Sequence, residues 1–156
     1  EALVWLAERD DVDAERIATP QRWNVAEVRR FMIVFGLVST AFDLLTFVLL
    51  QRVFAADEAT FQTAWFVVSL LTELAVLLVL RTHGPALRSA PGRLLLWTTA
   101  AVASFAIAAP FIGPFAGVFG FVPLPWPLLG AMMAIVGGYI LVTELAKRRF
   151  YRPGNA

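Results

Sequence analysis

The chain has 156 residues, of which 59% are hydrophobic and only 16% are charged. A soluble domain is nearer half apolar and about a quarter charged, so this composition argues against one. The net charge of +1 implies no acidic partner such as nucleic acid, and the absence of Cys excludes disulfides and thiolate metal sites. The composition therefore indicates an integral membrane protein.

The N-terminal segment, residues 1–30, is expected to hold the end of one helix and then a cytoplasmic linker. The chain opens at Glu1, without a starting Met, directly in an apolar run. We therefore expect a piece of a longer protein that is cut within a helix. Asn24 and Glu27 have the spacing of a capping box, which predicts that the next helix starts near Val25, in water.

Four apolar stretches of 17 to 20 residues follow, namely Phe31–Leu50, Ala64–Leu80, Leu94–Ile112 and Leu128–Ala146. At about 1.5 Å rise per residue, each covers most or all of a hydrocarbon core about 30 Å thick. The expected fold class is an all-α membrane protein with four antiparallel transmembrane helices plus the end of a preceding helix. Residues 31–146 would form the bundle, and residues 147–156 a basic cytoplasmic tail.

Proline and glycine mark the third connection. Pro110 is expected to end or kink the third span. The stretch 113–127 is apolar but rich in Pro and Gly, so it is not expected to form a regular helix. We expect a re-entrant or interfacial outer loop there, with Trp126 at headgroup depth. The fourth span carries small residues that suit close helix packing, at Gly130, Gly137 and Gly138.

The basic residues predict the orientation of these spans. Twelve of the 13 Lys and Arg residues fall on one side of the four-span topology, and only Arg52 falls on the other. The twelve are Arg9, Arg16, Arg22, Arg29, Arg30, Arg81, Arg88, Arg93, Lys147, Arg148, Arg149 and Arg152. The positive-inside rule places the N-terminal segment, the 81–93 loop and the C-terminus in the cytoplasm.

Two carboxylates lie deep within the predicted spans. Asp43 is about 18 Å and Glu73 about 12 Å from the cytoplasmic edge at helical rise. Ionisable groups at the centre of a span cost about 2.5–3.5 kcal/mol each on insertion scales, so they need a reason. With nearby hydroxyls at Thr40, Thr46 and Thr72, they offer the oxygen ligands that Mg²⁺ and Ca²⁺ prefer. Either they contribute to a cation site or path, or they are structural carboxyls that are protonated or bonded to a neighbouring helix.

Other polar and aromatic residues favour structural interpretations. Glu144 is four residues before Arg148, the spacing of a helical ion pair. His83 is the one His, in a loop without a partner at ligand spacing. Tyr139 and Tyr151 are expected to be ordinary interfacial anchors. The sequence contains no Gly-rich phosphate loop, no Ser–His–Asp set and no HExxH, so we assign no catalytic residue and expect no ATP hydrolysis by this chain alone.

Several runs of residues, in order and at matching spacing, resemble the seventh to tenth transmembrane helices of bacterial magnesium-transporting P-type ATPases. They are Pro20-x-Arg22-Trp23-Asn24, Arg30-Phe31-Met32, Phe42-Asp43-x-Leu45-Thr46-Phe47, Phe61-Gln62-x-x-Trp65-Phe66, Val122-Pro123-Leu124-Pro125 and Gly138-Tyr139 with Thr143 and Lys147. The resemblance covers nearly the whole chain. It implies an ion pump that uses ATP and Mg²⁺, with its phosphorylated Asp encoded upstream; no cofactor is expected in this part.

The resemblance also implies where cations bind, because the family's ion sites lie among its fourth, fifth, sixth and eighth helices. Counting back without gaps places Glu1 at the sixth-helix carboxylate that binds the ion, where the family usually has Asp. Glu73 falls in the eighth helix, where magnesium-type members often carry Gln and related calcium pumps carry a Glu ligand. The candidate metal ligands are therefore Glu73, Glu1 and Asp43.

The resulting hypothesis is a C-terminal membrane-support domain of an ATP-driven P-type cation pump in the bacterial inner membrane, with Mg²⁺ as the expected cation. It would brace the ion-translocating helices and supply a carboxylate ligand. Its expected partners are the lipid bilayer, the remaining helices and cytoplasmic domains of the parent pump, and the transported divalent cation. The alternative is a free-standing, non-enzymatic four-helix membrane subunit or scaffold, which the small residues of the third and fourth spans also suit.

Overall fold

The computed structural model describes residues 25–81 and 92–150, and these residues form helices and loops without any strand. The helices are α3 (Val25–Val48), α4 (Glu58–Leu80), α5 (Arg93–Ala108), α6 (Gly113–Phe119) and α7 (Trp126–Phe150). A π-helical segment, Leu49–Val53, continues α3, and a 3-10 turn, Ala109–Phe111, continues α5. The prediction of an all-α fold is confirmed.

Four of the described helices are long and apolar enough to cross a membrane. They cover Val28–Val53, Glu58–Leu80, Arg93–Phe111 and Trp126–Phe150. The four predicted spans fall within them, apart from one residue at the end of the third. The helices extend beyond the apolar stretches because a helix satisfies its own backbone and continues into water or headgroups.

The connection between α3 and α4 is short and ordered by local bonds. In the π-helical segment the amide of Phe54 donates to the carbonyl of Leu49 at 3.2 Å, and this wide turn carries Leu50 into the core at 0% exposure. Asp57 then caps α4, because its side chain accepts a hydrogen bond from the amide of Thr60 at 3.1 Å. α3 is helical from Val25, the first described residue, while its proposed cap, Asn24, lies outside the described residues.

The connection from α5 to α7 contains a short helix that the sequence did not predict. α5 ends at Ala108 and passes into a 3-10 turn that contains Pro110, as predicted for that proline. The following residues, Gly113–Phe119, form the short helix α6, although the sequence predicted no regular helix there. Pro114 is tolerated because it lies in the first turn, and Gly120, with φ of 68°, ends the helix in the left-handed conformation.

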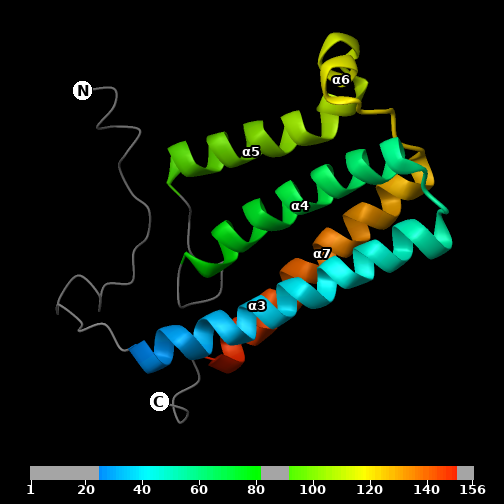
Figure 1. The fold of residues 1–156 in the computed structure, drawn as a ribbon. Helices are drawn as coiled ribbons and strands as arrows, with labels where there is room; N and C mark the ends of the chain where they lie inside the picture. The colour runs from blue at the N-terminus through cyan, green and yellow to red at the C-terminus, as the bar shows by residue number, and fades with distance from the viewer. Residues whose placement is uncertain (1–24, 82–91, 151–156) are drawn as a thin grey trace, which may run out of the picture.

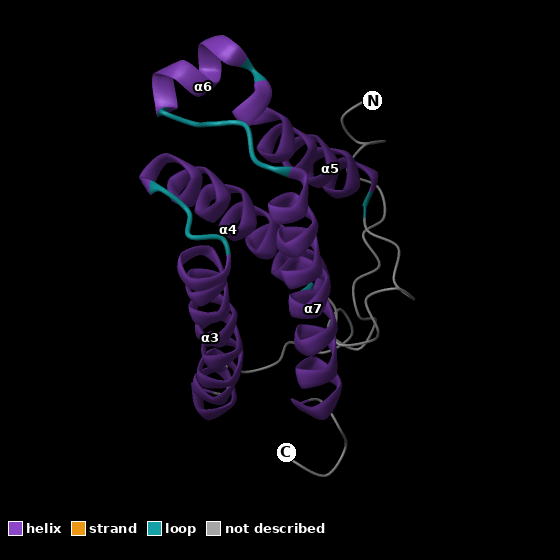
Figure 2. Ribbon diagram, turned by 90° about the vertical axis from the view of Figure 1, so that its right-hand side faces the viewer, coloured by secondary structure: helices purple, strands orange, loops and turns teal. Residues whose placement is uncertain are grey.

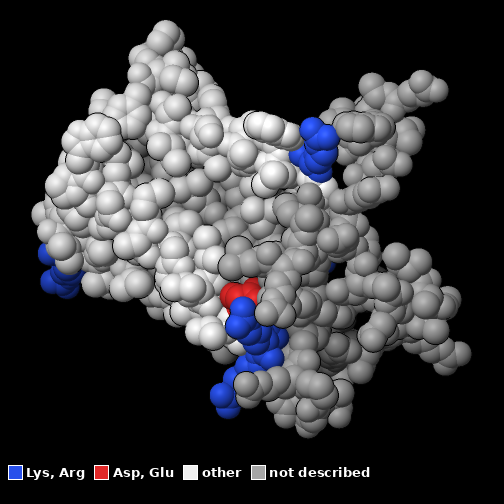
Figure 3. All heavy atoms as spheres, turned by 180° about the vertical axis from the view of Figure 1, so that it is seen from behind, with Lys and Arg blue, Asp and Glu red and all other residues white. Residues whose placement is uncertain are grey.

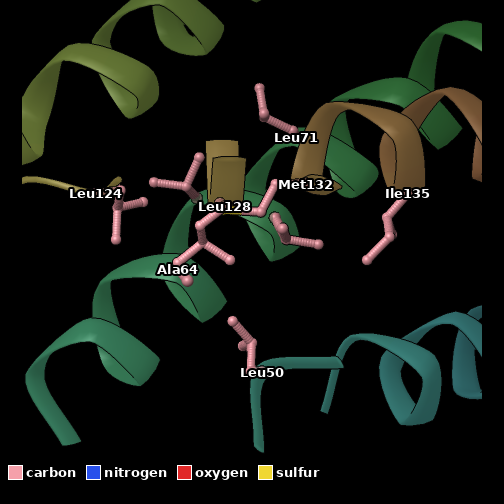
Figure 4. Packing of buried hydrophobic residues seen from close by; sticks show 9 residues of the cluster. Leu50, Ala64, Leu71, Leu124, Leu128, Met132 and Ile135 are labelled. Carbon is pink, nitrogen blue, oxygen red and sulfur yellow. The ribbon is translucent and has the colours of Figure 1, made fainter. Parts of the chain in front are cut away.

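α7 is the helix around which α3 and α4 pack. Figure 1 shows it running between them, with α5 on the other side of α4 and α6 beyond the end of α5. The view in Figure 2 again places α7 alongside α3. The core joins Leu128 and Met132 of α7 to Ala64 and Leu71 of α4, with Leu50 below them (Figure 4). α3 and α5 keep most of their surfaces outside this core, as expected for helices that face lipid or further helices.

Candidate cation-binding groove

A groove of about 840 Å³ lies between α3 and α4, with α7 and the start of α5 contributing to its wall. Its lining mixes carboxylates, hydroxyls, one arginine and apolar side chains. They are Phe31, Ser39, Phe42, Asp43, Thr46, Trp65, Val68, Ser69, Thr72, Glu73, Val76, Leu77, Leu80, Arg81, Leu95 and Tyr139. The groove therefore carries a strip of polar side chains within a lining that is mostly apolar.

The polar strip follows from helical spacing on the two facing helices. On α3, Ser39, Asp43 and Thr46 are at positions i, i+4 and i+7, which lie on one face. On α4, the groove receives Ser69 together with Thr72 and Glu73, one turn further on. Each helix thus presents one carboxylate and two hydroxyls to the same space.

The structure places Asp43 and Glu73, two of the three predicted ligands, in this one groove. Both side chains are exposed, and within the described part of the chain neither has a hydrogen-bond or ion-pair partner. The described residues contain no group of three His, Cys, Asp or Glu side chains that could hold a metal ion. Two carboxylates can supply part of a coordination shell, and Ca²⁺ or Mg²⁺ needs about six ligands. Glu1, the third predicted ligand, lies outside the described residues.

The hydroxyls of the groove are oriented by the backbone. Thr46 donates to the carbonyl of Phe42 at 2.8 Å, and Thr72 donates to the carbonyl of Val68 at 3.0 Å. Because the hydrogen of each hydroxyl is already committed, the oxygen remains available as an acceptor or ligand. Thr40, the third predicted hydroxyl, instead bonds the carbonyl of Gly36 at an exposed position and does not line the groove.

Tyr139 is a groove residue that the sequence analysis placed wrongly. It is not an interfacial anchor: it lies in the middle of α7, is 4% exposed, and its hydroxyl is 2.9 Å from that of Ser39. The Tyr139 ring also packs edge-on against Phe42. A signal was present, because Tyr139, Thr143 and Lys147 repeat every four residues and form a polar stripe on one face of α7.

The C-terminal end of α7 carries a charge cluster. Glu144 pairs with Arg148 at 3.1 Å, which confirms the predicted helical ion pair. The other oxygen of Glu144 is 3.0 Å from the ammonium of Lys147, which is fully buried and also donates to the carbonyl of Val79 at 2.7 Å. Figure 3 shows a small acidic spot beside basic side chains, while most of the other described surface in that view is uncharged. The sequence pattern predicts only a place in the basic tail for Lys147.

Comparison with known proteins assigns the chain to a family. Residues 8–149 match the family model described as the C-terminus of cation-transporting ATPases. The chain belongs to this family. The match includes all four membrane helices, so the groove is a feature of a cation-transporting ATPase C-terminal domain.

Individual relatives agree with the cation-transporting ATPase family. The chain is 39% identical over 148 residues to the magnesium-transporting ATPase, P-type 1, of Escherichia coli K12. It is 37% identical over 148 residues to a protein of the same name from Salmonella typhimurium strain 14028s, and 34% identical over 147 residues to another from strain LT2. These matches cover 91–92% of the chain but only 16% of the relatives' length.

Proposed function

We propose that this chain is the C-terminal transmembrane domain of an ATP-driven pump for a divalent cation, with Mg²⁺ as the first candidate. The family and the relatives named for magnesium transport support this function. ATP binding and phosphorylation would belong to the much longer remainder of such a pump, because no catalytic residue was assigned in this chain. Its own contribution would be structural support and carboxylate ligands.

The observation that carries the proposal is the position of Glu73 on the open face of α4. The opposite face of that helix packs against α7 through buried residues that include Val67, Leu71 and Ala75. A carboxylate within an apolar span, without a partner in the described residues, needs a counter-charge or hydrogen bonds from elsewhere. A bound cation would supply the counter-charge, and groups on other helices of the pump would supply the hydrogen bonds.

The support role follows from the same packing. In the resemblance, α4 corresponds to the eighth helix, which contributes to the ion sites of related pumps. α7 and the core cluster hold one face of α4, so the face with Glu73 is free to meet the helices that bind the ion. Asp43 would add a second carboxylate from α3, across the same groove.

The test is the cation dependence of ATP hydrolysis by the full-length protein, with Glu73→Gln compared with the native protein. Gln keeps the shape of Glu but removes the charge that a divalent cation prefers. We expect a higher concentration of free Mg²⁺ or Ca²⁺ for half-maximal activity, by about tenfold, because a charged ligand contributes on the order of 1–3 kcal/mol more than a neutral one.

Glu58→Gln is the matched control for this test. Glu58 lies in the first turn of the same helix, exposed and outside the groove, so its removal should leave the cation dependence unchanged. If Glu73→Gln and Glu58→Gln behave like the native protein for both ions, Glu73 is not a ligand and the chain only supports chemistry elsewhere.

A further inference from the structure

The buried lysine at the C-terminal end of α7 has no role in the groove chemistry described above. Lys147 is 0% exposed, although lysine is almost never fully buried unless it is paired. Its ammonium makes two contacts, one with the carbonyl of Val79 at 2.7 Å and one with the carboxylate of Glu144 at 3.0 Å. The side chain therefore crosses from α7 to the end of α4 and is neutralised by its own helix.

The carbonyl that accepts this bond belongs to the last turn of α4. α4 ends at Leu80, so the carbonyl of Val79 is one of the last four in the helix, which have no partner within it. These carbonyls carry the partial negative charge of the helix C-terminus, and a cation is stabilising there. Lys147 thus caps α4 from a neighbouring helix, with a charge-assisted bond.

The bond from Lys147 to the carbonyl of Val79 is directional, whereas most other contacts between α4 and α7 are non-directional apolar packing. The buried contacts between these helices come mainly from small and apolar side chains such as Ala64, Val67 and Met132. In lipid such contacts gain little from hydrophobic burial and tolerate small shifts between helices. The register of α4 is its position along and about its own axis relative to α7. Because Lys147 bonds to one particular backbone carbonyl, it favours one register over those shifted by a residue.

Register decides where Glu73 points. Glu73 is six residues before Val79 on the same helix, about 9 Å along its axis. A slip of α4 by one residue moves its side chains by about 1.5 Å and rotates them by about 100°. Such a slip would turn Glu73 away from the groove that it lines.

We propose that Lys147 is a positioning residue that fixes the register of α4, and through it the direction of Glu73. Glu144 supplies the counter-charge that makes a buried ammonium tolerable, and Arg148 in turn holds Glu144 from the solvent side. Lys147 does not line the groove. The link to cation binding rests on the proposed function of Glu73, while the effect on α4 does not.

The experiment measures helix register and cation affinity separately, in full-length protein whose other cysteines have been replaced. Ser69→Cys puts a thiol in the groove, and its labelling rate with a maleimide reports how α4 is turned. On this background we compare Lys147→Met, which keeps an unbranched chain one atom shorter but removes the charge, with Lys147→Arg, which keeps the charge. Arg149→Gln is the control, because Arg149 is exposed on the same end of α7.

We expect Lys147→Met to change the labelling rate by about threefold or more relative to the native protein. Lys147→Arg should keep the rate close to the native value, and the Arg149→Gln control should match it. Without the Cys substitution, Lys147→Met should raise the cation concentration for half-maximal ATP hydrolysis by about five- to tenfold, with a smaller change in maximal rate.

The two readouts separate the possible failures. An unchanged labelling rate in Lys147→Met overturns the positioning role, whatever happens to activity. A changed rate with unchanged cation affinity supports the positioning role and contradicts the proposed function of Glu73. If Lys147→Met does not accumulate in the membrane, Lys147→Gln replaces it, because it keeps a polar side chain but is too short to make the bond to the carbonyl of Val79. Unchanged labelling in that variant overturns the proposal, and changed labelling supports it.

Discussion

At the scale of single residues, the N-terminus of α4 is capped by one carboxylate, that of Asp57. Asp57 accepts a hydrogen bond from the amide of Thr60, and its bonds with Thr60 lower the pKa of Asp57 below its ordinary value of 3.8. A lowered pKa in the folded state means that the ionised cap is stabilising above the unfolded pKa. That stabilisation is lost as the pH falls through the lower, folded-state pKa.

The Asp57 cap gives a prediction for stability in detergent. Asp57→Ala should lower the melting temperature at about pH 7, because the first amides of α4 lose their acceptor. Asp57→Asn should keep most of the stability, since Asn also caps helices, but should lose the share of the acid-dependent destabilisation that comes from this residue. Circular dichroism melts of the three forms at about pH 7 and about pH 3 test this. An acid sensitivity in Asp57→Asn equal to that of the native chain would contradict it.

At the scale of elements, one glycine allows α3 to approach α7. A Cβ atom at Gly138 would lie 3.5 Å from the ring of Phe42, which is ordinary contact, but any larger side chain would meet that ring. Gly130 and Gly137, which the sequence also marked for close packing, have nothing within 4 Å of such an atom. The sequence shows that these glycines are small, but only the packing shows which of them faces a neighbouring helix.

We therefore expect position 138 to be sensitive to size. Gly138→Ala should be tolerated, whereas Gly138→Leu should force α3 from α7 and destabilise the bundle by about 1–3 kcal/mol, the usual range for overpacking. Gly130→Leu is the matched control on the same helix and should cause no loss. Urea or thermal unfolding in micelles measures the difference, and equal effects at positions 138 and 130 would show that α3 does not pack here as described.

The arrangement of charges predicts how the whole molecule lies in the membrane. The sequence puts twelve of the 13 basic residues on one side of the four spans, and from the positive-inside rule we expect both ends of the chain and the 81–93 loop to be cytoplasmic. In a full-length protein without other cysteines, Ala56→Cys should react with an impermeant thiol reagent in intact cells. Ser89→Cys should react only after the membrane is opened. The reverse pattern would mean that the orientation is inverted.

The membrane helices could be predicted from the sequence because a chain that crosses lipid must satisfy its own backbone hydrogen bonds, as a helix does. The lengths and positions of the four apolar helices and the Glu144–Arg148 pair follow from local sequence and helical rise. The groove could not be derived in the same way, since it depends on which faces of α3, α4 and α7 meet. For the same reason Tyr139 was mistaken for an anchor and Lys147 for part of a tail.

The π-helical segment Leu49–Val53 gives the chain a place where its length can change during evolution. A π turn holds one more residue than an α turn, so the loss of one residue there leaves an ordinary helical end. α3 before it and the Asp57 cap after it would keep their places. A homologue with one residue fewer at this position could therefore retain the same groove, and an alignment gap there would not signal a different fold.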